Sequence, residues 1–265
     1  MSVHEEIREQ QKKLKDQSFK AKLEYFWEYY KVHTLVVICV LIFAYMLIHD
    51  VLTSKPYGFY AIMLNSGASA AQDYLEKEFI EYSEFDAENY ECLIDTSASY
   101  NLKLIDDVTV ATSQKIVATI AAADLDVMVA DYDLFTHYAN QETLSDLRLY
   151  FSDAELKELE DRLFYVDQAY LDYLSSDDYQ NYISTGEFDP SNKYAVMADN
   201  YNKDFTLPET DPTKMQNPVP VGINMSDSAT LSNYGVYSGS TPVAGIIINT
   251  KRSDMAVKFI EYLMK

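Results

Sequence analysis

An apolar stretch of 19 residues constrains this chain more than any other feature of its sequence. It runs from Thr34 to Leu52 (TLVVICVLIFAYMLIHDVL), and no residue from Thr34 to Ile48 is charged. A helix of this length rises about 28 Å, close to the ~30 Å hydrocarbon core of a bilayer. Pro56 follows and cannot continue a helix. Aromatic residues typical of a membrane interface precede the stretch: Tyr25, Phe26, Trp27, Tyr29 and Tyr30. The sequence therefore predicts a transmembrane helix over residues 34–52.

Two other interpretations of this stretch fit its pattern less well. A buried helix of a soluble domain is rarely apolar on every face for five turns. A cleaved signal peptide has an apolar core of ~7–15 residues near the N-terminus, followed by a small-residue cleavage site. Here the core is longer, it begins at Thr34, and His49 and Asp50 follow it without an Ala-x-Ala motif. We expect an uncleaved, single-pass membrane anchor.

The distribution of charge predicts which side of the membrane each part occupies. Residues 1–33 hold seven basic and six acidic side chains, whereas residues 34–265 hold 14 basic and 36 acidic ones. Because Lys and Arg concentrate on the cytoplasmic side, the N-terminus is expected in the cytoplasm of a cell-membrane protein and residues 54–265 outside it. The segment 1–33 has amphipathic helical spacing, which suits either a helix lying on the lipid bilayer's anionic headgroups or a helix that docks a partner.

Beyond the span, apolar runs alternate with helical patterns. Strands are predicted over residues 57–64, 90–94, 125–130 and 243–249, and helices over 68–82 and 254–264, with Ser253 capping the last. Residues 108–111 fit a strand and 114–122 a helix, and Asp131 or Asp133 caps a short helix that runs to Ala139. Continuous apolar strands separated by helices indicate an α/β domain with a largely parallel sheet and flanking helices.

The middle of the outer domain is more helical and more acidic. Ser152 and Glu155 match a capping box, which predicts a helix from Asp153 to Leu163. Further helices are expected over 165–174 and 177–183, and weak strands over 193–197 and 222–225. Residues 202–220 are expected to be a loop, and residues 226–237 a loop or a short helix.

Two pieces of the outer domain resemble type 2 periplasmic (extracellular) solute-binding proteins. One is LDVMVADYDLF with HYANQETLSDL, whose matching positions are Asp126, Val127, Met128, Asp131, Phe135, Leu144, Asp146 and Leu147. The other is the tail PVAGIIINTKRSDMAVKFIEYLM, in which a cap near Ser253 precedes Ala256, Val257, Phe259, Ile260 and Leu263. The resemblance implies one lobe over 57–140 plus 243–265 and a reduced second lobe or insert over 141–242.

Composition and motifs argue against several function classes. The net charge of −21 excludes a phosphate-binding surface of the kind that nucleic acids need. The two cysteines, Cys39 in the predicted span and Cys92 beyond it, cannot pair or form a Cys-based metal site. No G-x-S-x-G, H-E-x-x-H, P-loop or G-x-G-x-x-G motif occurs. The pairs Asp124/Asp126 and Asp131/Asp133 are better explained as strand flanks and helix caps than as metal ligands, so we predict no enzyme, metal or cofactor.

Polar residues that follow three predicted strands form the candidate ligand site. They are Asn65, Ser66, Thr96, Ser97, Asp131 and Tyr132. In parallel sheets ligands bind outside the carboxyl ends of strands. The same short side chains also cap helices routinely, which is the competing interpretation. The acidic region from Glu142 to Pro220 is the second place to search.

Two functions stay open at this stage. The first is a non-catalytic extracellular domain that binds a small solute, a peptide or a cell-envelope protein. The second is a structural or assembly protein whose outer domain is an interaction platform. An open concave pocket favours the first, and a filled strand-end surface favours the second.

Overall fold

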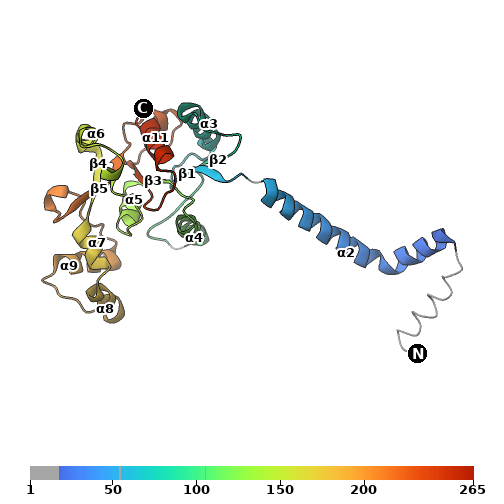
Figure 1. The fold of residues 1–265 in the computed structure, drawn as a ribbon. Coiled ribbons are helices and arrows are strands. Elements are labelled where there is room, and N and C mark those ends of the chain that lie inside the picture. Colours follow the sequence, from blue (N-terminus) through green and yellow to red (C-terminus); the bar gives the residue numbers. More distant parts are fainter. Residues whose placement is uncertain (1–17, 54, 105) are drawn as a thin grey trace. The chain divides into compact units, whose positions relative to one another are not determined.

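The computed structural model describes residues 18–53, 55–104 and 106–265, which divide into two compact units, Met1–Lys55 and Pro56–Lys265. In the first unit, α2 (Phe19–Thr53) is one continuous helix of 35 residues (Figure 1). Its segment Tyr30–His49 is long and apolar enough to cross a membrane, and none of that segment is buried in the structure. The predicted helical pattern over residues 1–17 lies outside the described residues.

The second unit is built on a six-stranded sheet with the order β2-β1-β3-β6-β5-β4. β1 pairs in parallel with β2 and with β3. The pairs β3–β6, β6–β5 and β5–β4 are antiparallel. The strands are β1 (Tyr57–Met63), β2 (Glu91–Asp95), β3 (Val127–Asp131), β4 (Leu163–Asp167), β5 (Pro218–Asn224) and β6 (Pro242–Ile246).

Helices flank the sheet and connect its strands (Figure 1). Side-chain caps begin several of them, among them Asp106 before α4, Asp131 before α5 and the capping box of Ser152 and Glu155 before α6. The helices are α3 (Gln72–Ser83), α4 (Asp107–Ala121), α5 (Tyr132–Ala139), α6 (Asp153–Glu158), α7 (Gln168–Leu174), α8 (Asp177–Thr185), α9 (Lys193–Asp204), α10 (Ala229–Asn233) and α11 (Ser253–Leu263).

Alternate residues of the strands supply two cores, one on each face of the sheet. Phe59 of β1 packs with Phe79 of α3 and Phe259 of α11, at ring-centroid distances of 4.8 and 5.0 Å. On the opposite face, Tyr60 of β1 and Phe135 of α5 belong to the second core. Because both faces are covered, β1 and β3 read as continuous apolar runs.

A third, smaller core is made largely of tyrosines. It joins α7 and α9 through Tyr170, Tyr173, Tyr194, Ala195 and Ala198. β4 and β5, which come from the segment 141–242, continue the main sheet. The division of the outer domain into two lobes stays a prediction.

A buried ion pair holds the beginning of β1. The carboxylate of Asp126, which is fully buried, accepts hydrogen bonds from Arg252 Nε at 2.9 Å and from the backbone N–H of Tyr60 at 2.9 Å. Arg252 also donates to the carbonyl oxygens of Tyr57 and Asp124. One guanidinium thus joins the starts of β1 and β3 to the loop before α11.

The α/β class with flanking helices is confirmed, but the sheet is mixed rather than largely parallel. Parallel pairing is confined to β2, β1 and β3, whereas β4, β5 and β6 are antiparallel. Burial on both faces makes a strand apolar whichever way it runs, so the apolar runs carried no information on direction.

Several predicted elements differ from the structure, among them the helix predicted over 153–163, which ends as α6 at Glu158. Residues 108–111 are helical because Asp106 caps α4 through the Thr109 N–H at 2.7 Å. Residues 193–197 begin the helix α9, which Asn192 caps. The predicted helix 165–174 is split, because residues up to Asp167 form β4. β5 begins at Pro218, inside the predicted loop.

The expected cap of the last helix is also corrected. Ser253 is the first residue of α11, and the cap position belongs to Arg252, whose side chain makes no capping hydrogen bond. The guanidinium is instead committed to Asp126.

Candidate functional site

Asn65 and Asp131 join the carboxyl ends of β1 and β3. Asn65 has a left-handed backbone (φ 56°), which directs its amide across the strand ends. Its Nδ2 donates to Asp131 Oδ2 at 2.9 Å and to the carbonyl of Tyr100 at 2.9 Å, while its Oδ1 accepts from the Tyr100 N–H at 2.9 Å. The Asn65 amide therefore fixes the loop after β2 against the ends of β1 and β3.

Ser66, Thr96 and Ser97 line a shallow polar hollow of about 410 Å³ at the ends of β1 and β2. Their hydroxyls are used within the protein. Ser66 donates to the carbonyl of Thr96 at 2.6 Å, Thr96 to the carbonyl of Ser69 at 3.2 Å, and Ser97 to Asp95 at 2.7 Å. These side chains order the loops around the hollow.

Tyr237 fills the crevice between the ends of β1 and β3. It is 4% exposed, and its hydroxyl donates to the carbonyl oxygens of Leu64 and Val129, each at 2.9 Å. Its backbone N–H donates to the carbonyl of Ser66 at 2.8 Å. Burial raises the pKa of the Tyr237 phenol well above its usual value, so the hydroxyl stays a donor. The position where parallel sheets bind ligands is thus occupied by a side chain of this chain.

The six predicted residues form two separate groups. Asn65, Ser66, Thr96 and Ser97 line the strand-end hollow, and Asp131 contacts Asn65. Tyr132 contacts Thr210 through its hydroxyl and packs its ring against Phe164, at 5.4 Å between centroids. Asp131 also caps α5 through the Leu134 N–H at 3.1 Å, as the competing interpretation expected. A ligand role for the six residues stays a prediction.

A larger hollow opens where the sheet divides. β5 pairs with β6 only through Ile223 and Asn224, and its first half pairs with β4 alone. Residues 143–145 occupy the place beside β6 that β5 leaves, because Ser145 N–H donates to the carbonyl of Ile246 at 2.8 Å and Ile248 N–H to that of Thr143 at 3.0 Å. The pairing of β6 with β5 ends at Ala244, and at the next residue, Gly245, an added Cβ atom would lie 2.7 Å from the Val221 carbonyl oxygen.

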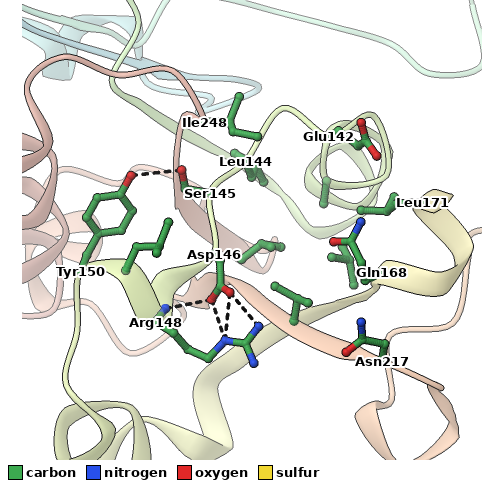
Figure 2. A pocket seen from close by; sticks show the side chains of 15 residues that line it. Glu142, Leu144, Ser145, Asp146, Arg148, Tyr150, Gln168, Leu171, Asn217 and Ile248 are labelled. Carbon is green, nitrogen blue, oxygen red and sulfur yellow. Dashed lines mark hydrogen bonds and ion pairs between the residues drawn. The ribbon is translucent and has the colours of Figure 1, made fainter. Parts of the chain in front are cut away.

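We call this hollow the fork pocket; its volume is about 560 Å³. Its apolar lining comes mainly from Leu144, Val166, Leu171, Val219 and Val221. Polar side chains surround it from three segments (Figure 2). They are Glu142, Asp146 and Arg148 from the segment between α5 and α6, Gln168 from the start of α7, and Asn217 before β5. An apolar floor with a few converging polar groups is the usual composition of a small-molecule site.

The charges at the fork pocket are largely neutralised. Arg148 Nε donates to both carboxylate oxygens of Asp146 at 2.9 Å, and its Nη2 donates to Oδ2 at 2.7 Å (Figure 2). Those hydrogen bonds raise the pKa of Arg148 above its ordinary value, so the guanidinium stays charged. The amides of Gln168 and Asn217 and the carboxylate of Glu142 offer both donors and acceptors. Such a lining suits a neutral polar molecule with an apolar face.

The described residues contain no group of three or more His, Cys, Asp or Glu side chains that could hold a metal ion. His137, a candidate base by residue type, contacts the hydroxyl of Tyr201 and the side-chain amide of Gln141. Burial lowers the pKa of His137 to about 4, so the imidazole is neutral at physiological pH.

Most residues that line the fork pocket lie within the segment that sequence reasoning named as the second place to search, Glu142 to Pro220, whereas Ala139, Val221 and Ile248 lie outside it. The individual residues were missed because β4 was predicted as helix and the start of β5 as loop. Pro218 and Pro220 were the available signal, since proline within a strand indicates an edge or an interrupted pairing.

Comparisons with known proteins find little similarity. No protein-family model and no curated protein matches the chain. Three chains of solved structures match it. One is an ABC substrate-binding protein from Listeria monocytogenes in complex with cycloalternan, with 12% identity and a TM-score of 0.35 over 79% of this chain and 75% of that one. This is a weak structural likeness to a solute-binding protein, and it assigns no ligand to this chain.

Proposed function

We propose that the protein is a membrane-anchored, non-catalytic binding protein whose fork pocket takes up a small neutral polar solute. The observation that carries the proposal is the composition of that pocket, which combines an apolar floor with polar side chains from three separate segments. Its volume of about 560 Å³ falls within the range of ~300–1,000 Å³ that small-molecule sites occupy.

The anchor in this proposal is α2, which crosses the bilayer once. Its segment Tyr30–His49 has the length and hydropathy of a membrane span. The basic residues concentrated before the span support a cytoplasmic N-terminus and an extracellular domain.

The charge of the domain supports a neutral solute over an anionic one. Residues 34–265 hold 36 acidic and 14 basic side chains, so the domain's field repels anions. At the pocket, Arg148 is already paired with Asp146. A saccharide of one or two rings combines hydroxyls for Gln168, Asn217 and Glu142 with an apolar ring face for the valines of the floor.

The strand-end residues Asn65, Ser66, Thr96, Ser97, Asp131 and Tyr132 provide the alternative site. Because most of their polar atoms already have partners within the protein, a ligand there would have to displace internal hydrogen bonds.

A thermal-shift titration of the full chain in nanodiscs with glucose, N-acetylglucosamine and maltose tests the proposal. A ligand present at 100 times its Kd stabilises by about 2.7 kcal/mol, which for a domain of this size raises Tm by roughly 5–10 °C. Gln168→Ala and Asn217→Ala should each weaken the shift, whereas the matched control Ser97→Ala at the strand end should not. A shift that Ser97→Ala and Asp131→Ala abolish and the pocket variants leave intact would move the site to the strand ends.

A second function, an interaction platform without a small-molecule ligand, is favoured by one observation. Tyr237 closes the crevice in which a parallel sheet would bind its ligand. If no saccharide shifts Tm while the protein co-assembles with a membrane partner, this second function replaces the first.

A further inference from the structure

Asp167, the last residue of β4, carries a carboxylate that accepts hydrogen bonds from other segments of the chain. It is 6% exposed and is not among the residues that line the fork pocket. Its Oδ1 accepts from the N–H groups of Ala169 and Asn217, at 3.2 and 2.9 Å. Its Oδ2 accepts from the N–H of Gln216 at 2.9 Å and from the hydroxyl of Tyr194 at 2.8 Å. A helix cap needs only the bond to Ala169, and the others hold the carboxylate to the loop before β5 and to α9.

Those hydrogen bonds fix the backbone at the two amide side chains of the fork pocket. Gln168 lies between Asp167 and Ala169 in the chain, and Asn217 donates its own N–H to the carboxylate. The N–H of Gln168 also donates to the carbonyl oxygen of Asn217 at 2.9 Å. Both amide side chains line the pocket (Figure 2). One buried carboxylate therefore holds the two residues whose amides the proposed solute would contact.

The Asp167 carboxylate is ionised at neutral pH. Burial alone would raise the pKa of Asp167, but the hydrogen bonds from Gln216 and Asn217 outweigh it and lower the pKa below its ordinary value. The ammonium of Lys193 lies 3.8 Å from Oδ2 and adds a positive charge nearby. An ionised carboxylate accepts stronger hydrogen bonds than a neutral amide oxygen does. Asparagine at this position would lose that strength, and its NH2 group would face an N–H donor.

The hydroxyl of Tyr194 links α9 to the same carboxylate. None of the residues that line the fork pocket belongs to α9. Tyr194 is 8% exposed and packs in the tyrosine core with Tyr170 and Tyr173 of α7. The position of α9 therefore bears on the loop that carries Asn217, through the Asp167 carboxylate.

We infer that Asp167 is the positioning residue of the fork pocket and that it makes solute affinity depend on α9. An amide that is free to move has to be ordered when a solute binds, and support from within the protein removes that cost. Asp167 acts through Gln168 and Asn217 and need not touch the solute itself. This inference rests on the proposed function, which assigns those two amides to a bound saccharide.

A second buried pair of the same kind provides the matched control. Asp199 of α9 accepts from the hydroxyl of Tyr182 of α8 at 3.0 Å, and the two residues are 8% and 7% exposed. Neither of them lines the fork pocket. Substitutions in this pair should therefore lower stability without altering the pocket amides.

Isothermal titration of the full chain in nanodiscs with glucose, N-acetylglucosamine and maltose tests the inference. Asp167→Asn should raise the Kd about tenfold and Tyr194→Phe about threefold, in line with the loss of hydrogen bonds to a charged group. The controls Asp199→Asn and Tyr182→Phe should leave the Kd unchanged, because the titration is made on folded protein. An unchanged Kd in Asp167→Asn, or an equal rise in Asp199→Asn, would overturn the positioning role. An unchanged Kd in Tyr194→Phe would overturn the dependence on α9.

Hydrogen exchange without any saccharide separates this inference from the proposed function. The N–H of Gln168 is bonded to Asn217 rather than to Asp167, so its exchange rate reports the arrangement that the carboxylate maintains. That rate should rise about tenfold in Asp167→Asn and stay unchanged in Asp199→Asn. An unchanged rate in Asp167→Asn would overturn the inference even if saccharides bind. If the wild-type chain binds no saccharide while Asp167→Asn still speeds this exchange, the proposed function fails and the positioning of the two amides stands.

Discussion

Replacing Arg252 with methionine should destabilise the outer domain by about 3–5 kcal/mol, the typical result of removing one partner from a buried ion pair. Asp126 is fully buried, and its carboxylate keeps only the Tyr60 N–H and the Thr250 hydroxyl as donors once the guanidinium is gone. The carbonyl oxygens of Tyr57 and Asp124 lose their donor as well. For a domain of this size the loss corresponds to a fall in Tm of roughly 6–20 °C.

The pH dependence of the loss identifies its cause. Burial already raises the pKa of Asp126, against the lowering effect of Arg252. A raised carboxyl pKa in the folded state weakens folding above that pKa, and the penalty is relieved as the pH falls through it. In Arg252→Met the pKa of Asp126 rises further, so the deficit relative to wild type should be largest at neutral pH and shrink on acidification.

Urea denaturation from pH 7 to pH 4, with the double variant Asp126→Leu/Arg252→Met, provides the assay. The double variant should be more stable than Arg252→Met alone, because no uncompensated charge remains. Lys214→Met, which breaks an exposed pair with Glu209, is the control and should leave the free energy of unfolding unchanged. A loss below about 1 kcal/mol for Arg252→Met, or a deficit that does not change with pH, would refute the reasoning.

Three further predictions concern other parts of the chain. Burial lowers the pKa of His137 to about 4, so wild-type stability should fall as the pH drops from about 6.5 toward 4, by up to about 3 kcal/mol; His137→Gln should flatten that part of the stability profile. Tyr237→Phe removes the donor to the carbonyls of Leu64 and Val129 and should cost about 1–3 kcal/mol in chemical denaturation, with unchanged fold by circular dichroism. A cysteine at Ser191 in a Cys-free background should react with an impermeant thiol reagent on intact cells while one at Ser18 should not; the reverse labelling would invert the topology.

Much of the fold was predictable because its patterns are local. The apolar strands β1, β2, β3 and β6 and the capping box of Ser152 and Glu155 are written in short windows of sequence. The short strand β4 was not predictable in this way. Its sequence LFYVD runs directly into the helix α7, and the apolar residues of the two segments together have the spacing of a single helix. Residues 193–197 read as strand by composition, yet Asn192 caps a helix there and Tyr194, Ala195 and Ala198 bury one side of it.

The site was less predictable because it depends on contacts between distant segments. The sequence identified the polar residues after the strands, but not that Tyr237 fills the crevice between β1 and β3 from more than 100 residues away in the chain. The fork pocket depends on where β5 leaves β6, and only the paired prolines of β5 indicated that the pairing is interrupted.

The most direct test of the central claim uses the scarcity of tryptophan in this chain. Trp27 is the single tryptophan, so Leu149→Trp in a Trp27→Phe background places one fluorophore at the fork pocket, on a side chain that is 74% exposed. Titration with glucose, N-acetylglucosamine and maltose should give a saturable change in emission for the Leu149→Trp chain and none for the control Ile183→Trp. Flat titrations of the Leu149→Trp chain with every saccharide, or equal changes in both variants, would contradict a solute site in the fork pocket.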